Sequence, residues 1–238
     1  MRYYQFTNKG GRERNEDFIS CYMDEKKNTG IFILADGLGG HGHGEVASEL
    51  IVRAMMEKFK SAKVIDTGSV QEIMKSTNDL LLKAQEQTQY KRMKSTAVLL
   101  AVQKNSILCA HIGDSRLYHF GAGGVQFITA DHSVSYKKYR QGQISYDAIS
   151  ADEDRSSLLR VMGNSEKFEP EITILLGTGK AFLLCCDGFW EYVKKDEMFI
   201  DLLKSEDPKE WTEYMLLRHI ARAEEKNDNF SSIAVFLD

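Results

Sequence analysis

The chain has 238 residues, of which 42% are hydrophobic and 28% charged, and its net charge is −4. A chain of this length buries a core without covalent staples, and its small negative charge gives no general attraction to nucleic acid or anionic membranes. No apolar run approaches the roughly 20 residues of a membrane span, and the N-terminus lacks the apolar segment of a signal peptide. The four cysteines form no CxxC pair. We expect a cytoplasmic protein with reduced cysteines that binds neither nucleic acid nor a membrane.

Nine apolar stretches of strand length follow one another along the chain. Several are separated by only a few turn-type residues, and such short connections favour antiparallel neighbours. The stretches are Phe18–Met23, Gly30–Ala35, Ser95–Val102, Ser106–Ile112, Arg116–Phe120, Val125–Ile128, Ile172–Leu176, Ala181–Cys186 and Phe230–Leu237.

Three longer segments carry apolar residues at helical spacing. The first runs from Val46 to Phe59, the second from Val70 to Ala84, and the third, with poorer phase, from Trp211 to Ala223. Strands and helices come in blocks and do not alternate, which favours an α+β fold of stacked layers over a doubly wound parallel sheet. The chain shows no linker, repeat or low-complexity stretch, so residues 1–238 are expected to form one domain.

Acidic residues stand at the ends of several of these strands. The stretch FILADGLGGHGHGE ends an apolar strand in Asp36-Gly37, and Asp187-Gly188 repeats the pattern. Further acids flank strands at Asn15-Glu16-Asp17, Asp114 and Asn227-Asp228-Asn229. Any one of them is explained by a turn, because Asp and Asn side chains bond nearby backbone amides. Several carboxylates gathered at one sheet edge would repel one another, however, and a divalent cation removes that repulsion.

Three kinds of site compete for the glycine-rich stretch after Asp36. A phosphate-binding loop needs GxxxxGK[ST], or GxGxxG leading into a helix, and DGLGGHGHGE contains neither. A zinc site needs more nitrogen or sulfur ligands than His41 and His43 offer. Oxygen ligands favour Mg²⁺ or Mn²⁺, so we interpret the stretch as part of a carboxylate site for a hard cation. Its glycines would let backbone carbonyls approach the ion.

Taken together, these residues resemble the motifs of the PP2C-type (PPM) metal-dependent serine/threonine protein phosphatases, particularly the compact bacterial members. The matching segments occur in the family's order across nearly the whole chain. They are Arg12–Asp17, Asp36–Ser48, Ser95–Ala97, Gly113–Arg116, Thr129–Ser133, Asp187-Gly188 and Asp228-Asn229. The resemblance implies a four-layer α-β-β-α sandwich of two antiparallel sheets flanked by helix pairs, with a binuclear metal site at one end.

The resemblance also implies which residues hold the metals. Asp36 is expected to bridge two Mn²⁺ or Mg²⁺ ions, and Gly37 to contribute its backbone carbonyl. Asp187 and Asp228 are expected to hold the first ion. Asp114 matches the acid that joins Asp187 in a third, weaker metal site of bacterial relatives.

Three residues near the N-terminus complete the implied site. Glu16 and Asp17 are expected to hold metal-bound waters, and Arg12 to bind the substrate phosphate. An arginine suits that role because its guanidinium offers phosphate two parallel hydrogen bonds. Two divalent ions activate a water and relieve charge on the phosphoryl oxygens. No Cys-x5-Arg motif is present, so the expected nucleophile is metal-bound water, without a covalent enzyme intermediate.

Two departures from the family pattern leave roles open. Leu38 stands where animal members carry a histidine that acts as general acid, and His41 is better explained as a loop residue than as that acid. Downstream of Asp131-His132-Ser133, many relatives have a His-Pro-x-Arg element, whereas this chain has Asp152-Glu153-Asp154-Arg155. The polar segment 133–170 is either a surface loop or, as the resemblance to the family's flap favours, an element that reads the substrate. Lys137, Lys138 and Arg140 would then hold acidic residues that flank a phosphorylated site, while Asp152–Asp154 would repel such residues or favour basic ones.

The sequence leaves three functions in competition. The first is hydrolysis of phosphoserine and phosphothreonine in proteins, which would oppose a Ser/Thr kinase and would be carried out by a monomer. The second keeps the site but acts on small phosphoesters. The third is a catalytically silent module that binds phosphoproteins, and the intact set of Asp36, Asp187 and Asp228 argues against it.

Overall fold

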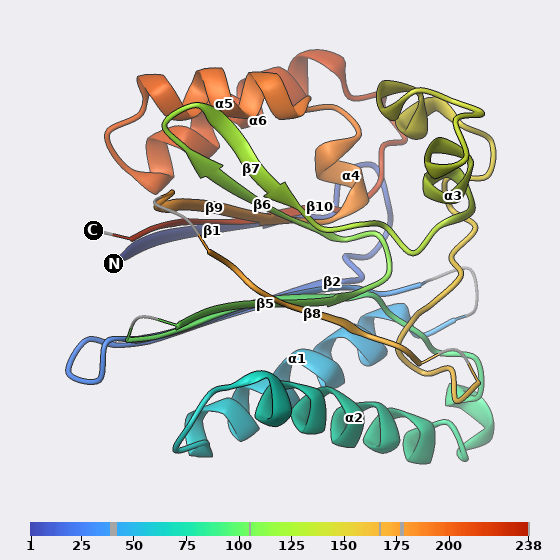
Figure 1. Cartoon of the computed structure of the whole chain (residues 1–238). Helices are drawn as coiled ribbons and strands as arrows, with labels where there is room; N and C mark the ends of the chain where they lie inside the picture. Colours follow the sequence, from blue (N-terminus) through green and yellow to red (C-terminus); the bar gives the residue numbers. More distant parts are fainter. Residues whose placement is uncertain (39–41, 105, 167, 177–178, 238) are drawn as a thin grey trace.

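Two antiparallel sheets lie face to face at the centre of the molecule (Figure 1). The computed structural model describes residues 1–38, 42–104, 106–166, 168–176 and 179–237. Within these residues the first sheet has the strand order β1 (Arg2–Asn8), β10 (Phe230–Phe236), β9 (Ala181–Cys185), β6 (Arg116–Gly121) and β7 (Gly124–Ile128). The second has the order β2 (Asp17–Asp24), β3 (Thr29–Asp36), β4 (Ala97–Gln103), β5 (Ser106–Ile112) and β8 (Glu171–Ile174).

A pair of helices covers the outer face of each sheet (Figure 1). The second sheet carries α1 (Gly44–Ser61) and α2 (Thr67–Ala84), and the first carries α5 (Lys195–Lys204) and α6 (Pro208–Arg222). Shorter helical segments are η2 (Thr88–Tyr90), α3 (Val134–Arg140), η3 (Tyr146–Ala151) and α4 (Asp187–Trp190). The predicted α+β class and its four α-β-β-α layers are therefore confirmed. In the described part of the chain, no helix has both the length and the apolar character needed to cross a membrane.

Strand β3 is apolar at nearly every position because both of its faces are buried. Ile31 and Ile33 belong to the core beneath α1 and α2, whereas Phe32 and Leu34 belong to the core that also contains residues of β6, β9 and β10. Successive side chains of a strand point to opposite faces, so a strand covered on both sides needs apolar residues throughout. The apolar run therefore carries Asp36, at its end, to the edge of a rigid sheet.

All nine predicted strands are present, with bounds that differ by a few residues, and the three predicted helical segments correspond to α1, α2 and α6. The apolar pattern misses β1, because this edge strand is mostly exposed and mixes polar with aromatic residues. It also misses α5. The cysteines are unpaired, and Cys109, Cys185 and Cys186 are buried.

Candidate active site

The acidic groups singled out from the sequence meet at one end of the sandwich. Asp17 begins β2 and lies directly opposite Asp36 at the end of β3. Asp187 follows β9, Asp228 precedes β10, and Asp114 lies in the turn between β5 and β6. In antiparallel neighbours, the end of one strand meets the start of the next at the same edge of the sheet. The register of the strands therefore gathers acids that are far apart in the sequence.

These acids surround a cavity of about 500 Å³. Seven of the eight predicted site residues line it, and Asp17 lies behind the lining. The lining residues are Arg12, Glu16, Asp36, Gly37, Leu38, Lys94, Asp114, Ser156, Leu158, Leu159, Val161, Asn164, Asp187 and Asp228. The lining thus combines carboxylates with several residues of the segment 156–164.

Asp17 is held at the junction of the two sheets. Its Oδ2 accepts hydrogen bonds from Ser231 Oγ at 2.7 Å and Cys186 Sγ at 3.1 Å. Its Oδ1 is buried and has no hydrogen-bond partner among the described residues. A buried carboxylate oxygen without a partner is costly, so this atom fits the predicted role of holding an ion-bound water.

Four buried carboxyl groups of the site, those of Asp17, Asp36, Asp114 and Asp187, have raised pKa values. Burial raises the pKa of Asp36 and of Asp114 well above the usual range, and neighbouring carboxylates, Asp187 among them, raise both further. Burial also raises the pKa of Asp17 to about 7 and that of Asp187 to about 6. Such a cluster of crowded oxygen donors is the set that a hard divalent cation prefers. The residues present therefore fit the predicted metal ions.

Buried side chains fix the backbone that carries these acids. The carbonyl of Asp36 accepts hydrogen bonds from Ser95 Oγ at 2.7 Å and from Thr96 N at 2.8 Å. Trp190 Nε1 donates to the carbonyl of Asp114 at 3.0 Å. His219 Nε2 donates in the same way to the carbonyl of Gly188, next to Asp187, at 2.8 Å. Because these anchors are buried, the site is organised by the protein itself.

Gly37 is the one predicted ligand that would contribute a backbone carbonyl. Its N–H donates to the carbonyl of Glu16 at 3.0 Å, and a Cβ at this position would lie 2.1 Å from the carbonyl oxygen of Gly44. Only glycine allows this approach between the end of β3 and the start of α1.

Asn229 anchors the loop that carries Arg12. Its Oδ1 accepts from the Glu16 N–H at 2.8 Å, and its Nδ2 donates to the carbonyls of Lys9 and Arg14 at 2.8 and 2.9 Å. Arg12 Nη2 in turn bonds Asp228 Oδ2 at 2.8 Å. The pattern Asp228-Asn229 is visible in the sequence, but only the fold shows that the asparagine holds the N-terminal loop against the acid cluster.

The three cationic flap residues named from the sequence lie outside the described lining of the cavity. Lys138 is bonded within the segment, to Asp152 at 3.0 Å and to Asp154 at 2.9 Å. Lys137 and Arg140 are exposed, and neither belongs to the described lining of the cavity. The part of the flap that reaches the site is 156–164, which the charge pattern does not single out. His41, weighed above as an acid or zinc ligand, lies outside the described residues.

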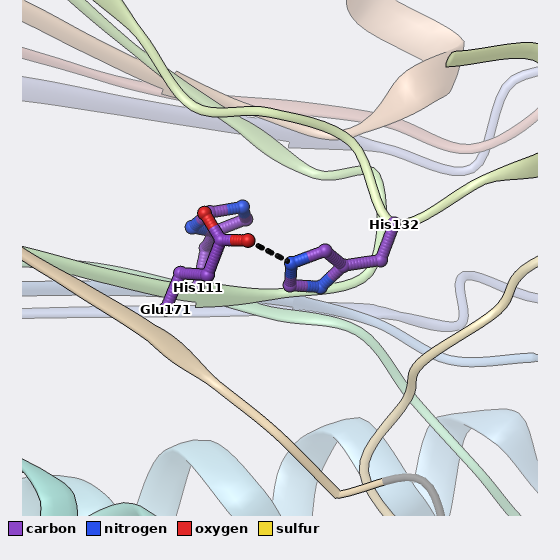
Figure 2. Close-up of side chains that lie close together, drawn as sticks. All are labelled: His111, His132 and Glu171. Carbon is purple, nitrogen blue, oxygen red and sulfur yellow. Dashed lines mark hydrogen bonds and ion pairs between the residues drawn. The ribbon is translucent and has the colours of Figure 1, made fainter. Parts of the chain in front are cut away.

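A second group of potential metal ligands consists of His111, His132 and Glu171, whose candidate atoms lie within 4.8 Å of one another (Figure 2). His132 Nδ1 accepts from the Gly113 N–H at 3.2 Å, so the neutral ring carries its proton on Nε2, which contacts Glu171 Oε1 at 3.2 Å. His111 Nε2 donates to the carbonyl of Ala130. An ion would have to displace the proton that His132 shares with Glu171. These hydrogen bonds indicate that the two histidines stabilise the turn that carries Asp114.

A carboxylate-lined cavity with an arginine, at one end of an α-β-β-α sandwich, defines a phosphatase-like site. The chain belongs to the protein phosphatase 2C family, whose sequence model matches residues 9–224. It is 33% identical to the serine/threonine phosphatase stp of Listeria welshimeri over 201 residues, which cover 82% of this chain and 79% of that protein.

Solved structures agree with this assignment. A crystal structure of a bacterial serine phosphatase has a TM-score of 0.90 at 28% identity and covers 100% of this chain and 98% of that one. The structure of the serine/threonine phosphatase Stp1 from Staphylococcus aureus has a TM-score of 0.87 at 28% identity, with 99% of this chain and 94% of that one covered. The predicted family, and the prediction that the chain is a phosphatase, are confirmed.

Proposed function

We propose that this phosphatase hydrolyses phosphoserine and phosphothreonine in proteins and uses two divalent cations, Mn²⁺ or Mg²⁺, to do so. The observation that carries the proposal is the convergence of buried acids with raised pKa values on the cavity that also contains Arg12. An empty site of this kind is unfavourable, whereas cations and a phosphate group would satisfy both the carboxylates and the arginine.

Each acid has a place in the proposed centre. Asp36 would serve both ions, the Gly37 carbonyl would add a ligand, and Asp187 and Asp228 would hold the first ion. Glu16 and Asp17 act through water, in keeping with the half-buried position of Glu16 and the unpartnered Oδ1 of Asp17. Asp114 forms a third, weaker site together with Asp187.

When bound, the ions supply an activated water and relief of negative charge on the phosphoryl oxygens. Arg12 orients the phosphate: its loop is anchored by Asn229, and its guanidinium is already directed to the cavity by Asp228. Leu38 lines the cavity and offers no proton, so protonation of the leaving alkoxide is left to water or to another group.

The proposal is tested by removing the metal. Exhaustive chelation, followed by elemental analysis, should abolish hydrolysis of a phosphothreonine peptide, and added Mn²⁺ or Mg²⁺ should restore it. Full activity in protein shown to be free of metal would refute the two-ion centre.

A small phosphoester is the second candidate substrate, because a cavity of about 500 Å³ is also of the size that takes small ligands. Rates on a phosphothreonine peptide and on a sugar phosphate, measured with the same metal-loaded protein, separate the two. Under the first function the enzyme would work as a cytoplasmic monomer that opposes a Ser/Thr kinase.

A further inference from the structure

Lys94 lines the same cavity as the acids, but no motif of the sequence points to it. The residue is half-buried, and its side chain makes no ion pair or hydrogen bond with any residue that the structure describes. Arg12, the other cationic residue of the described lining, is bonded to Asp228 at 2.8 Å. Lys94 is therefore the cation of this cavity that is left for a ligand.

The backbone around Lys94 is fixed on both sides. Its carbonyl accepts from the Leu38 N–H at 3.0 Å, next to the predicted ligand Gly37. The following residue, Ser95, exchanges backbone hydrogen bonds with Met162 at 3.3 and 2.9 Å. Lys94 therefore stands where the end of β3 meets the 156–164 part of the flap.

Two simpler explanations of Lys94 can be weighed. A lysine placed only to offset the charge of the acid cluster would be expected to pair with one of its carboxylates, and no such pair is present in the described residues. A lysine that serves only solubility gains nothing from a half-buried place in a cavity wall. Close to a site for divalent cations, an unpaired ammonium weakens metal binding by repulsion unless an anion lies between them.

We propose that Lys94 determines substrate specificity by binding an acidic side chain next to the phosphorylated serine or threonine. Arg12 and the metal ions already account for the phosphoryl group, whereas the lining of the cavity also contains Leu38, Leu159 and Asn164, which suit the peptide part of a substrate. A carboxylate of the peptide would pair with the ammonium at this wall. The inference rests on the function proposed above.

The test uses two phosphothreonine peptides, one with aspartates flanking the phosphothreonine and one with alanines, together with a small aryl phosphate. Wild-type protein, Lys94→Ala, Lys94→Glu and Lys94→Arg are loaded with Mn²⁺ and compared. The matched control is Lys91→Ala, which changes an exposed lysine outside the described lining of the cavity. Melting temperature and Mn²⁺ affinity are measured for every variant, to show that the fold and the metal site are intact.

Lys94→Ala should lower kcat/KM for the acidic peptide roughly ten-fold relative to the neutral peptide, the size of one hydrogen bond between charged groups, and mainly through KM. Lys94→Glu should reverse the preference, Lys94→Arg should keep it, and Lys91→Ala should leave it unchanged. An unchanged preference in Lys94→Ala, or an equal loss on all three substrates, would overturn the assignment. If the wild-type enzyme hydrolyses the aryl phosphate but neither peptide, the proposed function fails, and this result is distinct from any effect of Lys94.

Discussion

Removal of metal should add a loss of stability that grows as the pH rises from 5 to 8. In the fold without ions, the pKa of Asp17 is raised to about 7 and that of Asp187 to about 6, from the ordinary 3.8 of an aspartic acid. A carboxyl with a raised pKa keeps its proton in the folded state at a pH where the unfolded chain has lost it. Folding then takes up protons, so stability declines with rising pH from about 4 until the folded pKa is passed.

Asp17 alone gives the order of magnitude, because the raised pKa values of Asp36, Asp114 and Asp187 belong to the same coupled cluster and the contributions do not simply add. About two pH units separate pH 5 from the folded-state pKa of Asp17, and each unit corresponds to about 1.4 kcal/mol. The free energy of unfolding should therefore fall by about 3 kcal/mol. For a protein of this size, 1 kcal/mol shifts the melting temperature by about 2–4 °C. Burial lowers the pKa of His111, His132 and His219, so these histidines raise stability over part of the same pH range, with or without metal. Measured against a Mn²⁺-loaded series, in which the same histidines titrate, the chelated protein should therefore lose roughly 6–12 °C in melting temperature between pH 5 and pH 8.

The assay is thermal or urea unfolding at several pH values between 5 and 8, with a chelator in one series and Mn²⁺ in the other. Bound ions stabilise the ionised carboxylates, so in the Mn²⁺ series the decline should vanish or reverse. Asp36→Asn removes one crowded carboxyl, so it should flatten the decline in the chelated series, whereas Asp79→Asn on the exposed face of α2 should not. A melting temperature that changes with pH in the same way in the chelated and the Mn²⁺ series would refute the reasoning.

Three further predictions concern activity and metal binding. Asp36→Asn should cut turnover by orders of magnitude without destabilising the chelated protein; normal turnover would contradict its role as the bridging ligand. Arg12→Ala should raise KM for a phosphopeptide roughly ten- to hundred-fold with Mn²⁺ affinity little changed, and Arg12→Lys should rescue only partly, since lysine lacks the two-donor fork. Ser231→Ala should weaken Mn²⁺ binding, measured calorimetrically, by about ten-fold, because Asp17 loses a hydrogen bond. Ser232→Ala, which removes a buried hydroxyl without a partner among the described residues, is the matched control, and equal losses in both serine variants would argue against the Asp17 contact.

Most of the acid set can be predicted from sequence because each acid follows or precedes an apolar strand. Asp36-Gly37 and Asp187-Gly188 stand out for this reason, and β3 and β9 are found close to their predicted bounds. Their meeting at one end of the sandwich, by contrast, depends on strand order and register, which the sequence suggests only through resemblance to a family. That resemblance also supplies the roles, since composition alone cannot distinguish a bridging carboxylate from a turn aspartate.

The residues that sequence reasoning misses act through contacts between distant segments. Ser231 reaches Asp17 across 214 positions of the chain, and Asn229 reaches Lys9 across 220. Lys94 gives no local signal either, because one lysine in a polar stretch is ordinary until the fold places it in a cavity wall. The charge pattern of the flap suggests Lys138 as a substrate contact. The sequence does not reveal that this lysine forms an ion pair with Asp152 of the same segment.

The contacts at Asp17 also show how the fold itself holds the acids close together. Asp17 belongs to the second sheet, whereas its partners Cys186 and Ser231 follow β9 and lie in β10 of the first, so the site spans the junction of the two sheets. The spacing of the sheets is set by large buried side chains such as Phe32 and Phe182, and a close-packed core of this kind yields little to local repulsion. The acids are therefore held in place by the core at a cost in stability. Ions that bind only the folded state return that free energy, which is why metal removal should be visible in the unfolding curve as well as in the rate.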